Sequence, residues 1–426
     1  MSNRTDRKRR GIKTLKLRRR INFVLFILLL VLIIVGMRTK DFDKGSMQKI
    51  GDPNATPPVV MADGAEIYSL DLEEPVYQKN ADEHIDPYSI TKILTCYLAL
   101  ENLDMNKKVK VSKNAAKPLE DGTTIYLKEG EKIKVKDLLY GAMLESGNDA
   151  ATALGEAVSG SEKEFAALMN STVEEWGCEN THFVNANGWK HKKQYTSAHD
   201  MSVIASKAFG NEDLRKISLT KEYTIPRTNL TGERLLSNHT LKGTKKLKNL
   251  TCGKTGGWTS KDCSLVVGFS KNNMNEIIVL LRTGTKKRRD DAKALMEFAP
   301  EVTPGYKVVT NGEPILEARI KGGKKTKVDL CTAEDIYAYP KGQKKSGVRF
   351  ETELNKLKAP APAGSEAGTY TMYVDDKEVQ SGALYTAEDI EKGLPLSMLY
   401  ISDTLGIILV VFVVLWIVLL ALIRRM

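Results

Sequence analysis

Two stretches without charged residues frame the chain, one near each end. Residues 21–37 and residues 405–423 are each long enough to cross a membrane as a helix. The first follows a basic tail at residues 1–20, and the second is followed by Arg424 and Arg425. Because basic residues mark the cytoplasmic ends of membrane helices, the pattern predicts two transmembrane helices with both termini in the cytoplasm. A cleaved signal peptide is the alternative for the first stretch, although no A-x-A pattern follows it.

Between these stretches the hydrophobic pattern changes twice. Residues 38–60 carry prolines and no regular pattern, which predicts an extended linker. Residues 61–300 have helix-like segments in the middle and strand-like segments around them, which predicts an α+β domain. Its predicted helices are 135–144, 162–176, 197–209 and 290–298, and its predicted strands are 65–70, 76–78, 223–225, 252–257, 264–269 and 276–281.

Residues 301–395 alternate between strands and turns only, which predicts a small all-β domain resembling a β-sandwich. The predicted strands of this domain are 307–309, 314–320, 328–330, 348–350, 369–374 and 382–385. A tight turn is predicted at Asp375 and Asp376.

The net charge of +11 is confined to the two ends of the chain. Residues 1–20 hold ten Lys or Arg and one acidic residue, and Arg424 and Arg425 add the remaining two charges. The rest of the chain is formally neutral, which argues against a nucleic-acid-binding surface.

The chain has five cysteines, an odd number, so at least one thiol is free or pairs with another molecule. Cys252 and Cys263 fall on strands predicted to be neighbours, which leaves a disulfide open between them. Small buried thiols are the interpretation that the sequence favours. None of the five histidines has the spacing of a metal site, so no metal is expected.

Ser89 and Lys92 open a strongly apolar helical segment of the α+β domain. Pro87 just before them is typical of a helix start. Residues three apart share a helix face, so the hydroxyl and the amine are predicted to lie within reach of each other. Residues 93–100 are apolar on all sides, which predicts a buried helix. A lysine entering such a helix costs free energy unless it has a partner or a function, so this pair is a candidate nucleophile and base.

Two later motifs complete a set known from serine penicillin-binding proteins and class A β-lactamases. Ser146-x-Asn148 lies at a predicted corner between two helices, and Lys254-Thr255-Gly256 lies at a predicted inner strand edge. None of the motifs is specific alone, because each recurs elsewhere. The copies are Ser218-x-x-Lys221, Ser112-x-Asn114, Ser270-x-Asn272 and the variant Lys345-Ser346-Gly347. These copies do not lie at the start of a buried helix, at a corner between helices or at an inner strand edge. The prediction of a catalytic site therefore rests on the three chosen motifs together and in order.

With the segments 138–141, 146–151 and 181–185, these motifs make the chain resemble the D-alanyl-D-alanine carboxypeptidases, the low-molecular-mass penicillin-binding proteins. The resemblance covers residues 61–395. It implies a penicillin-binding-protein/β-lactamase-like transpeptidase domain followed by a small all-β domain, anchored in the cell membrane with the catalytic domain outside the cytoplasm. Peptidoglycan stem peptides are the implied substrates and β-lactam antibiotics the implied covalent inhibitors, with no cofactor.

The resemblance also implies roles in catalysis. Ser89 would attack the carbonyl of the penultimate D-alanine, and Lys92 would be the base, which requires a lowered pKa. Ser146 would relay a proton to the leaving amine. The backbone N–H groups of Ser89 and Gly257 would form the oxyanion hole.

Further residues would bind the substrate. Asn148 would hold its backbone, and Lys254 and Thr255, followed by Gly256, would bind its terminal carboxylate. Arg288 is a candidate for an arginine that the family uses for the same carboxylate. The alternative for Arg288 is a solvated basic run, Lys286-Lys287-Arg288-Arg289.

The sequence departs from the family pattern around the pocket. Tyr88 stands where alanine is usual, Glu145 where proline is usual, and Gly257 where a side chain is often present. Trp189 and Trp258 fall in predicted loops near the site, although packing is the favoured interpretation for both. A β-lactamase-like hydrolase and a catalytically idle wall-binding scaffold remain alternatives, the first disfavoured because no recognisable glutamate supplies fast deacylation.

Overall fold

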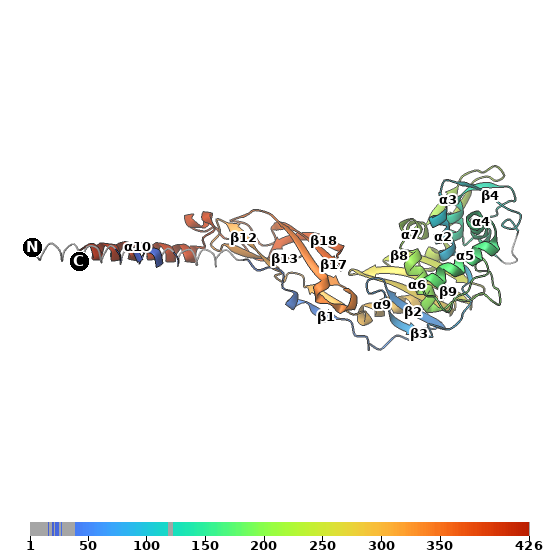
Figure 1. The fold of residues 1–426 in the computed structure, drawn as a ribbon, viewed down its shortest axis with the longest axis horizontal. Helices are drawn as coiled ribbons and strands as arrows, with labels where there is room; N and C mark the ends of the chain where they lie inside the picture. The colour runs from blue at the N-terminus through green and yellow to red at the C-terminus, as the bar shows by residue number, and fades with distance from the viewer. Residues whose placement is uncertain are drawn as a thin grey trace, which may run out of the picture. The chain divides into compact units, whose positions relative to one another are not determined.

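The computed structural model describes residues 39–117 and 122–425, with residues 16, 19, 20, 22–24 and 27 of the N-terminal tail (Figure 1). Most of the membrane span predicted at 21–37 therefore lies outside the described residues. The chain divides into two units. The larger unit holds residues 49–306 and 339–343, and the smaller unit holds 307–338, 344–425 and the described residues before 49.

The larger unit is built on an antiparallel five-stranded sheet in the order β3–β2–β10–β9–β8. Its strands are β2 (Gly64–Ser69), β3 (Glu74–Lys79), β8 (Leu250–Gly257), β9 (Cys263–Lys271) and β10 (Met274–Thr283). Nearly every residue of β9 and β10 is buried, because the centre of the sheet is covered on both faces. The strands predicted at 65–70 and 76–78 are confirmed, and they pair as the antiparallel hairpin β2–β3.

The larger unit has eight described α-helices, and five of them pack around a sixth, α2. The set is α2 (Lys92–Asn102), α3 (Val135–Leu144), α4 (Asn148–Ser159), α5 (Glu162–Glu175), α6 (Ala198–Ala208), α7 (Glu212–Leu219), α8 (His239–Gly243) and α9 (Lys287–Val302). α2 packs against α3, α4, α5, α6 and α7, and Ile93, Leu94 and Cys96 are fully buried. The predicted buried helix is confirmed, and its N-terminal end brings Lys92 into the core.

Two local predictions are wrong, and two short helices were missed. Ser89 does not lie in the first turn of α2 but in a separate 3₁₀ turn, η2 (Tyr88–Thr91). β6 (Glu222–Ile225) does not join the main sheet and pairs with β7 (Arg234–Ser237) instead, as β4 (Lys108–Lys110) pairs with β5 (Lys132–Lys134). α7 and α8 were not predicted, because helices of 8 and 5 residues contain too few turns to establish an apolar period.

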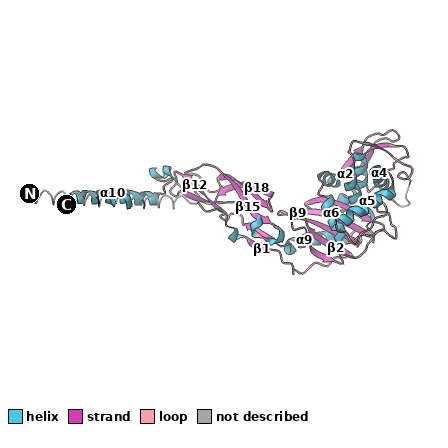
Figure 2. Ribbon diagram, in the orientation of Figure 1, coloured by secondary structure: helices cyan, strands magenta, loops and turns pink. Residues whose placement is uncertain are grey.

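The smaller unit is all-β apart from its 3₁₀ turns and its terminal helices (Figure 2). One sheet has six strands in the order β15–β17–β18–β13–β12–β16, and β1, β11 and β14 form a three-stranded sheet. The strands are β1 (Gln48–Ile50), β11 (Gly305–Val309), β12 (Leu316–Lys321), β13 (Lys327–Cys331), β14 (Ile336–Ala338), β15 (Val348–Leu354), β16 (Leu357–Lys358), β17 (Glu366–Val374) and β18 (Lys377–Thr386). Asp375 and Asp376 turn β17 into β18 with φ of 48° and 63°, which confirms the predicted turn.

The last helix of the smaller unit is α10 (Asp403–Arg425), which follows the 3₁₀ turn η5 (Pro395–Leu399). Within the part of the chain that the structure describes, no helix combines the length and the apolar character needed to cross a membrane. The span predicted at 405–423 is therefore not confirmed.

All five cysteines carry free thiols. Cys252 and Cys263 do lie on the neighbouring strands β8 and β9, but Cys252 pairs with Gly268 and Cys263 pairs with Gly257. The two thiols are thus at opposite ends of the strand pair, which excludes a disulfide between them and agrees with the favoured interpretation.

Candidate active site

Ser89 and Lys92 meet at the junction of η2 and α2. The Lys92 ammonium nitrogen, Nζ, lies 2.9 Å from Ser89 Oγ. The 3₁₀ turn keeps the predicted spacing of three residues, because i and i+3 lie on the same side of such a turn. Tyr88, just before the serine, has a φ of +50°, a left-handed conformation that costs a non-glycine residue about 1–2 kcal/mol. Strain of this kind gathers at functional sites.

Lys92 is fully buried and has three hydrogen-bond partners. Besides Ser89, Nζ donates to Asn148 Oδ1 at 2.7 Å and to the backbone carbonyl of Asn187 at 2.5 Å. Burial lowers the pKa of Lys92 well below its ordinary value, and the positive charge of Lys254 lowers it further. A lysine with such a pKa loses its proton readily and can take one from the adjacent serine hydroxyl.

Ser146 lies at the corner between α3 and α4, as predicted. Its backbone is left-handed, with a φ of +62°, and its carbonyl accepts from Thr123 Oγ1 at 2.6 Å. Asn148 begins α4, and its N–H donates to the Thr123 carbonyl at 2.8 Å. The segment around Thr123 therefore fixes the corner from both sides, which positions the Ser146 hydroxyl and the Asn148 amide next to Lys92.

Lys254 lies on β8, the strand at the edge of the main sheet. Its Nζ donates to Ser146 Oγ at 2.9 Å and to the Thr255 carbonyl at 2.9 Å. Burial lowers the pKa of Lys254 to about 7, and the charge of Arg288 acts in the same direction. The structure thus contains two serine–lysine pairs, Ser89–Lys92 and Ser146–Lys254, close enough for the charge of Lys254 to act on Lys92.

β8 lies in close contact with η2. Gly256 lies against the turn so closely that a Cβ atom there would be 3.1 Å from Ser89 N. The Thr255 N–H points away from β9, because it donates to Thr240 Oγ1 at 3.0 Å, whereas the Trp258 N–H donates toward β9, to the Asp262 carbonyl. N–H directions alternate along a strand, so the Gly257 N–H points off the open edge, as an oxyanion donor beside Ser89 must.

A cavity of about 300 Å³ opens beside Ser89. Its walls come from η2, the 122–123 segment, the start of α4, the loop after Asn187 and the end of β8. The lining residues are Tyr88, Ser89, Gly122, Thr123, Asn148, Asn187, Gly188, Trp189, Gly257, Trp258 and Thr259. Three of the residues predicted for the site, Ser89, Asn148 and Gly257, therefore line this cavity directly.

Comparison with known proteins agrees with this arrangement. The family model for D-alanyl-D-alanine carboxypeptidases matches residues 54–285, and the model for the C-terminal domain of penicillin-binding protein 5 matches residues 305–392. The chain belongs to the D-alanyl-D-alanine carboxypeptidase family.

Relatives of this carboxypeptidase family cover most of the chain. The D-alanyl-D-alanine carboxypeptidase DacF of Bacillus subtilis is 30% identical over 373 residues, 85% of this chain and 95% of that protein. The structure of penicillin-binding protein 5 from Haemophilus influenzae aligns with a TM-score of 0.54 at 28% identity, covering 80% of this chain and all of that one. The Streptomyces K15 DD-transpeptidase aligns with a TM-score of 0.53 at 28% identity, covering 57% of this chain and 98% of that one.

Arg288 lies in the first turn of α9 and is only half-buried in this carboxypeptidase. Its charge lowers the pKa of Lys254, so the two cations are close enough to interact. The Arg288 Nε atom is buried and has no hydrogen-bond partner among the described residues, whereas Lys286 and Lys287 are exposed. Arg288 therefore does not belong to a uniformly solvated basic run.

Two contacts of the carboxypeptidase site were missed by the sequence. The Asn187 carbonyl binds Lys92, and Thr240 holds the Thr255 N–H. The first contact uses a backbone atom, which no residue pattern reveals. The second comes from α8, which was itself not predicted.

The departures at Tyr88 and Glu145 have structural roles. Tyr88 is buried, and its hydroxyl faces Asp86 Oδ2 at 3.5 Å. Glu145 closes the corner before Ser146 by accepting from Ser237 N at 2.5 Å and pairing with His239 Nε2 at 3.0 Å. Neither residue displaces a catalytic group. Within the described residues, no three His, Cys, Asp or Glu side chains come together as a metal site.

Proposed function

We propose that the protein removes the terminal D-alanine from peptidoglycan stem peptides through an acyl-enzyme on Ser89. The observation that carries this proposal is the fully buried Lys92 amine, 2.9 Å from Ser89 Oγ, with its pKa lowered by burial and by Lys254. A buried amine of this kind supplies a base for a serine nucleophile without histidine. Membership of the carboxypeptidase family supports the choice of reaction.

Acylation follows from the two serine–lysine pairs. Ser89 Oγ attacks the carbonyl carbon of the penultimate D-alanine while its proton moves to the neutral Lys92 amine. The negative charge that forms on the carbonyl oxygen is bound by the N–H groups of Ser89 and Gly257, donors that are commonly worth about 3 kcal/mol each. Ser146 Oγ, which accepts from Lys254, passes a proton to the leaving nitrogen as the C–N bond breaks. D-Alanine departs, and Ser146 regains its proton from Lys254, which donates to it. Water then attacks the ester on Ser89 and gives its proton through Ser146 to the neutral Lys254. Lys92 returns its proton to Ser89 Oγ.

Substrate binding uses the positive end of the site. Lys254, Thr255 and Arg288 carry the charge and the hydroxyl suited to the free carboxylate of the terminal D-alanine. Asn148, which lines the cavity beside Ser89, is placed to bind the peptide backbone. Gly256 allows β8 to approach η2, because any larger residue would press on the Ser89 amide.

Release of D-alanine from a D-Ala-D-Ala peptide tests the reaction. The intact protein is expected to release it, and S89A is expected to lose at least about a thousandfold in rate, the scale on which loss of a nucleophile acts. S218A is the matched control, because Ser218 has the same spacing to Lys221 but donates within α7 to the Arg215 carbonyl. Absence of D-alanine release from the intact protein would overturn the proposal.

Penicillin separates this reaction from the two alternatives. A carboxypeptidase of this kind is expected to form a long-lived adduct on Ser89, which mass spectrometry of the intact protein detects. Rapid turnover of penicillin without a persistent adduct would instead indicate a β-lactamase-like hydrolase. No adduct at all would indicate an idle wall-binding scaffold.

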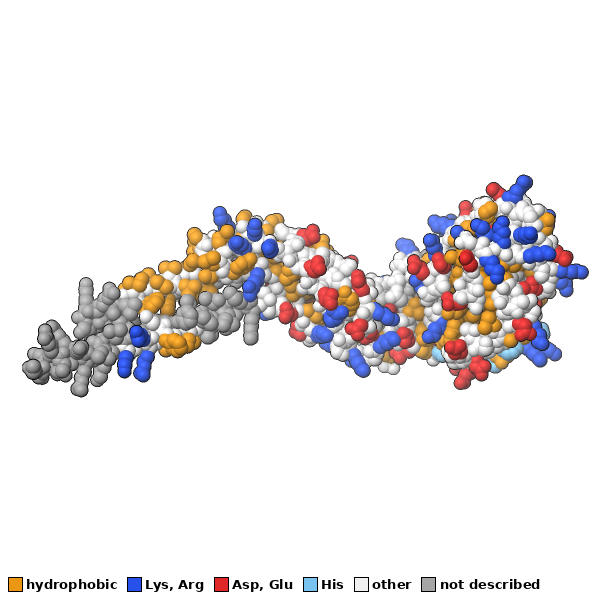
Figure 3. All heavy atoms as spheres, turned by 45° about the horizontal axis from the view of Figure 1, so that its top comes forward, with side chains coloured by type: hydrophobic (Ala, Val, Ile, Leu, Met, Phe, Trp, Pro, Cys, Tyr) orange, Lys and Arg blue, Asp and Glu red, His pale blue; other side chains and the backbone are white. Residues whose placement is uncertain are grey.

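We also infer that the protein is held at the cell membrane, with the larger unit outside the cytoplasm. This inference is supported by the apolar stretches at 21–37 and 405–423 and by the basic residues next to them. In α10, large apolar side chains are exposed along the helix, as the orange atoms of Figure 3 illustrate, including Ile407, Val410, Val414 and Leu422. Exposed apolar surface of this extent needs a nonaqueous partner, which a lipid bilayer provides.

A further inference from the structure

Glu145 and His239 lie between two of the catalytic motifs, and the chemical steps use neither of them. Glu145 directly precedes Ser146, the serine proposed to pass a proton to the leaving nitrogen. His239 is the first residue of α8. Glu145 Oε2 lies 3.0 Å from His239 Nε2, and this nitrogen carries a hydrogen, because a carboxylate only accepts hydrogen bonds. The contact therefore joins the corner at Ser146 to α8.

α8 in turn contacts the strand that carries the third motif. Thr240, the residue after His239, accepts from the Thr255 N–H at 3.0 Å with its Oγ1, and the two threonine hydroxyls lie 3.2 Å apart. Both threonines are buried, so water does not compete for these contacts. Thr255 follows Lys254, whose Nζ donates to Ser146 Oγ at 2.9 Å.

These contacts close a ring that starts and ends at the Ser146 hydroxyl. Each link is either a step to the next residue of the chain or one of the three side-chain contacts just described. The members of the ring are, in order, Ser146, Glu145, His239, Thr240, Thr255 and Lys254. β8 is also held by its pairing with β9, whereas the corner at Ser146 belongs to no regular element. Opening the ring is therefore expected to move the corner and leave the strand in place.

The corner needs support because its backbone is strained. Ser146 has a φ of +62°, and a left-handed residue other than glycine persists only where the surrounding structure fixes it. Thr123 supplies one set of contacts to the corner. Glu145 supplies a second set, because its other carboxylate oxygen, Oε1, accepts from Ser237 N at 2.5 Å.

The partner of Glu145 is carried by an anchored backbone. Asn238, just before His239, is buried, and its Nδ2 donates to the carbonyls of Ser218 and Thr220 at 2.7 and 2.9 Å. Its Oδ1 accepts from Leu241 N at 3.0 Å, which caps α8. His239 is thus a fixed point to which Glu145 ties the corner.

We propose that Glu145 and His239 are positioning residues, which hold the Ser146 hydroxyl where it hands a proton to the leaving nitrogen. The inference rests on the proposed carboxypeptidase function and adds two residues to it. The pair touches neither the substrate nor the reacting atoms and acts through Ser146. Its loss therefore impairs the step that brings a proton to the leaving group and spares the attack by Ser89, which depends on Lys92.

Two substrates that differ only in the leaving group test this role. Nα,Nε-diacetyl-L-Lys-D-Ala-D-Ala releases an amine, whose nitrogen must take up a proton as the C–N bond breaks. The matched thioester, in which sulfur replaces the nitrogen of the last D-alanine, releases a thiolate, because thiols are acidic enough to leave as anions near neutral pH. The two substrates share the same carbonyl and the same terminal carboxylate. A comparison of their kcat/KM values therefore isolates the proton transfer by Ser146.

E145A and H239A are each expected to lower kcat/KM for the amide by about tenfold, less than the hundredfold or more that a proton donor itself contributes. For the thioester the loss is expected to stay below about twofold, since no proton is needed there. H239Q is expected to retain most of the amide rate, because glutamine keeps an N–H donor for Glu145. The double variant E145A/H239A should be no slower than the slower single variant, because both substitutions open the same ring.

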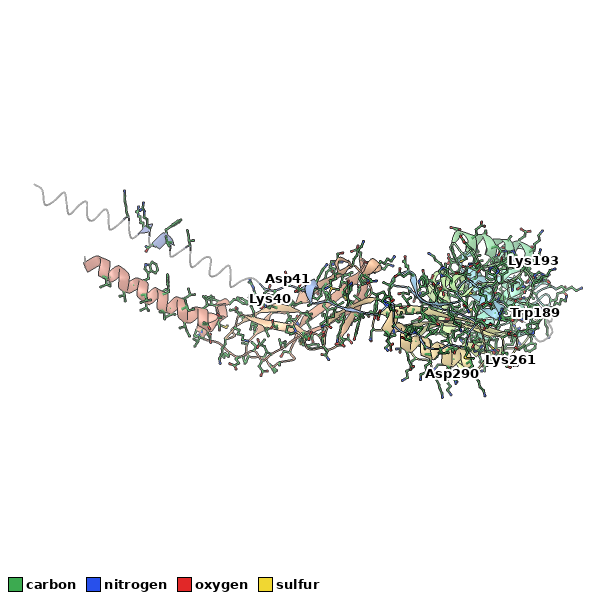
Figure 4. The ribbon with its side chains drawn as sticks, turned by 90° about the horizontal axis from the view of Figure 1, so that it is seen from below. Lys40, Asp41, Trp189, Lys193, Lys261 and Asp290 are labelled. Carbon is green, nitrogen blue, oxygen red and sulfur yellow. The ribbon has the colours of Figure 1, made fainter. Side chains whose placement is uncertain are left out.

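D290A is the matched control, because it also removes one partner of an ion pair. Asp290 Oδ1 lies 3.5 Å from Arg289 Nη2, and Asp290 is labelled at the outer edge of the larger unit in Figure 4. Both residues belong to α9 and lie outside the ring. This variant is expected to cleave both substrates at the rates of wild type.

Equal slowing of the two substrates in E145A and H239A, or no slowing of either, overturns the inference, because a purely structural role does not depend on the leaving group. Wild-type protein that cleaves neither substrate is a different result, which overturns the proposed function and the inference with it.

Discussion

Two buried lysines decide the chemistry at the scale of single residues. Lys92 and Lys254 are both fully buried, and burial is the main cause of the lowered pKa of each. Each amine also has a serine oxygen at 2.9 Å. The positive charge of Lys254 further disfavours the protonated form of Lys92, so the second lysine helps to make the first a base.

This coupling predicts how the reaction depends on pH. Acylation of Ser89 by a penicillin is expected to rise with pH as Lys92 loses its proton, and to level off below the ordinary lysine pKa of 10.5. In K254Q the neighbouring positive charge is absent, so the ammonium form of Lys92 is less disfavoured and its pKa is higher. The rising limb should therefore move to higher pH, whatever the change in the maximal rate. Stopped-flow acylation rates with a fluorescent penicillin, taken across a pH series, measure the rising limb of wild type and that of K254Q.

K221Q serves as the control for that series, because Lys221 has the same serine spacing but is exposed. Its profile should coincide with that of wild type. If the acylation rate of K254Q rises at the same pH as that of wild type, or at a lower pH, the charge of Lys254 does not act on Lys92.

The sequence was a good guide to these side chains and a poor guide to their surroundings. Ser89, Lys92, Ser146 and Lys254 were predicted from motif order, and the structure joins them in two hydrogen-bonded pairs. The Asn187 carbonyl could not be predicted, because backbone atoms are the same for every residue. The position of Arg288 was ambiguous for a different reason, since each residue of a basic run at a helix start points in a different direction.

At the scale of elements, the site depends on how closely η2 and the loop after Asn187 approach each other. Gly188 has a φ of +83°, and a Cβ atom there would lie 1.8 Å from the Tyr88 carbonyl oxygen. No side chain fits in that space. The contact holds the carbonyl of the preceding residue, Asn187, against Lys92.

Gly188 offers a test of this contact. G188A is expected to lower the free energy of unfolding by about 3 kcal/mol, because backbone strain and overpacking add. It is also expected to slow acylation of Ser89, since the loop that binds Lys92 must move. Chemical denaturation and penicillin acylation rates measure the two effects separately.

The control for G188A is G160A. Gly160 has the same φ of +83°, but no atom lies within 4 Å of a Cβ placed there. Only the backbone strain remains, so about 1 kcal/mol of stability should be lost and acylation should be unchanged. Equal effects of the two substitutions on acylation would show that the close approach of Gly188 to Tyr88 does not position the catalytic base.

Long elements were predictable and short ones were not. α3, α5 and the buried α2 follow from apolar periods that extend over several turns. η2 has four residues, and its left-handed Tyr88 is held by contacts with Gly188, a hundred positions further along the chain. Such a contact has no local signal, which is why Ser89 was assigned to the wrong turn.

At the scale of the whole molecule, the proposed reaction requires the larger unit to reach the cell wall. The larger unit contains every residue of the proposed site. The smaller unit contains α10, whose exposed apolar side chains are the described feature best suited to lipid. Catalysis and the proposed membrane attachment therefore belong to different units, so they should be separable by substitution.

Charged substitutions in α10 test this separation. In a chain beginning at residue 39, which removes the N-terminal apolar stretch, V410K together with V414K is expected to release the protein from membranes. Val410 and Val414 are about half exposed, and a lysine near the centre of a membrane helix costs about 3 kcal/mol. The released protein should still be acylated by penicillin at the rate of the membrane-bound form.

V379K is the control for the membrane experiment, because Val379 is exposed on β18 rather than on α10. This variant should stay in the membrane fraction through an alkaline wash, as the unsubstituted chain should. In the full-length chain, protease added outside right-side-out vesicles should digest the larger unit, since the basic ends favour the cytoplasm. Retention of V410K/V414K by membranes, or protection of the larger unit from external protease, would contradict attachment through α10 with the active site outside.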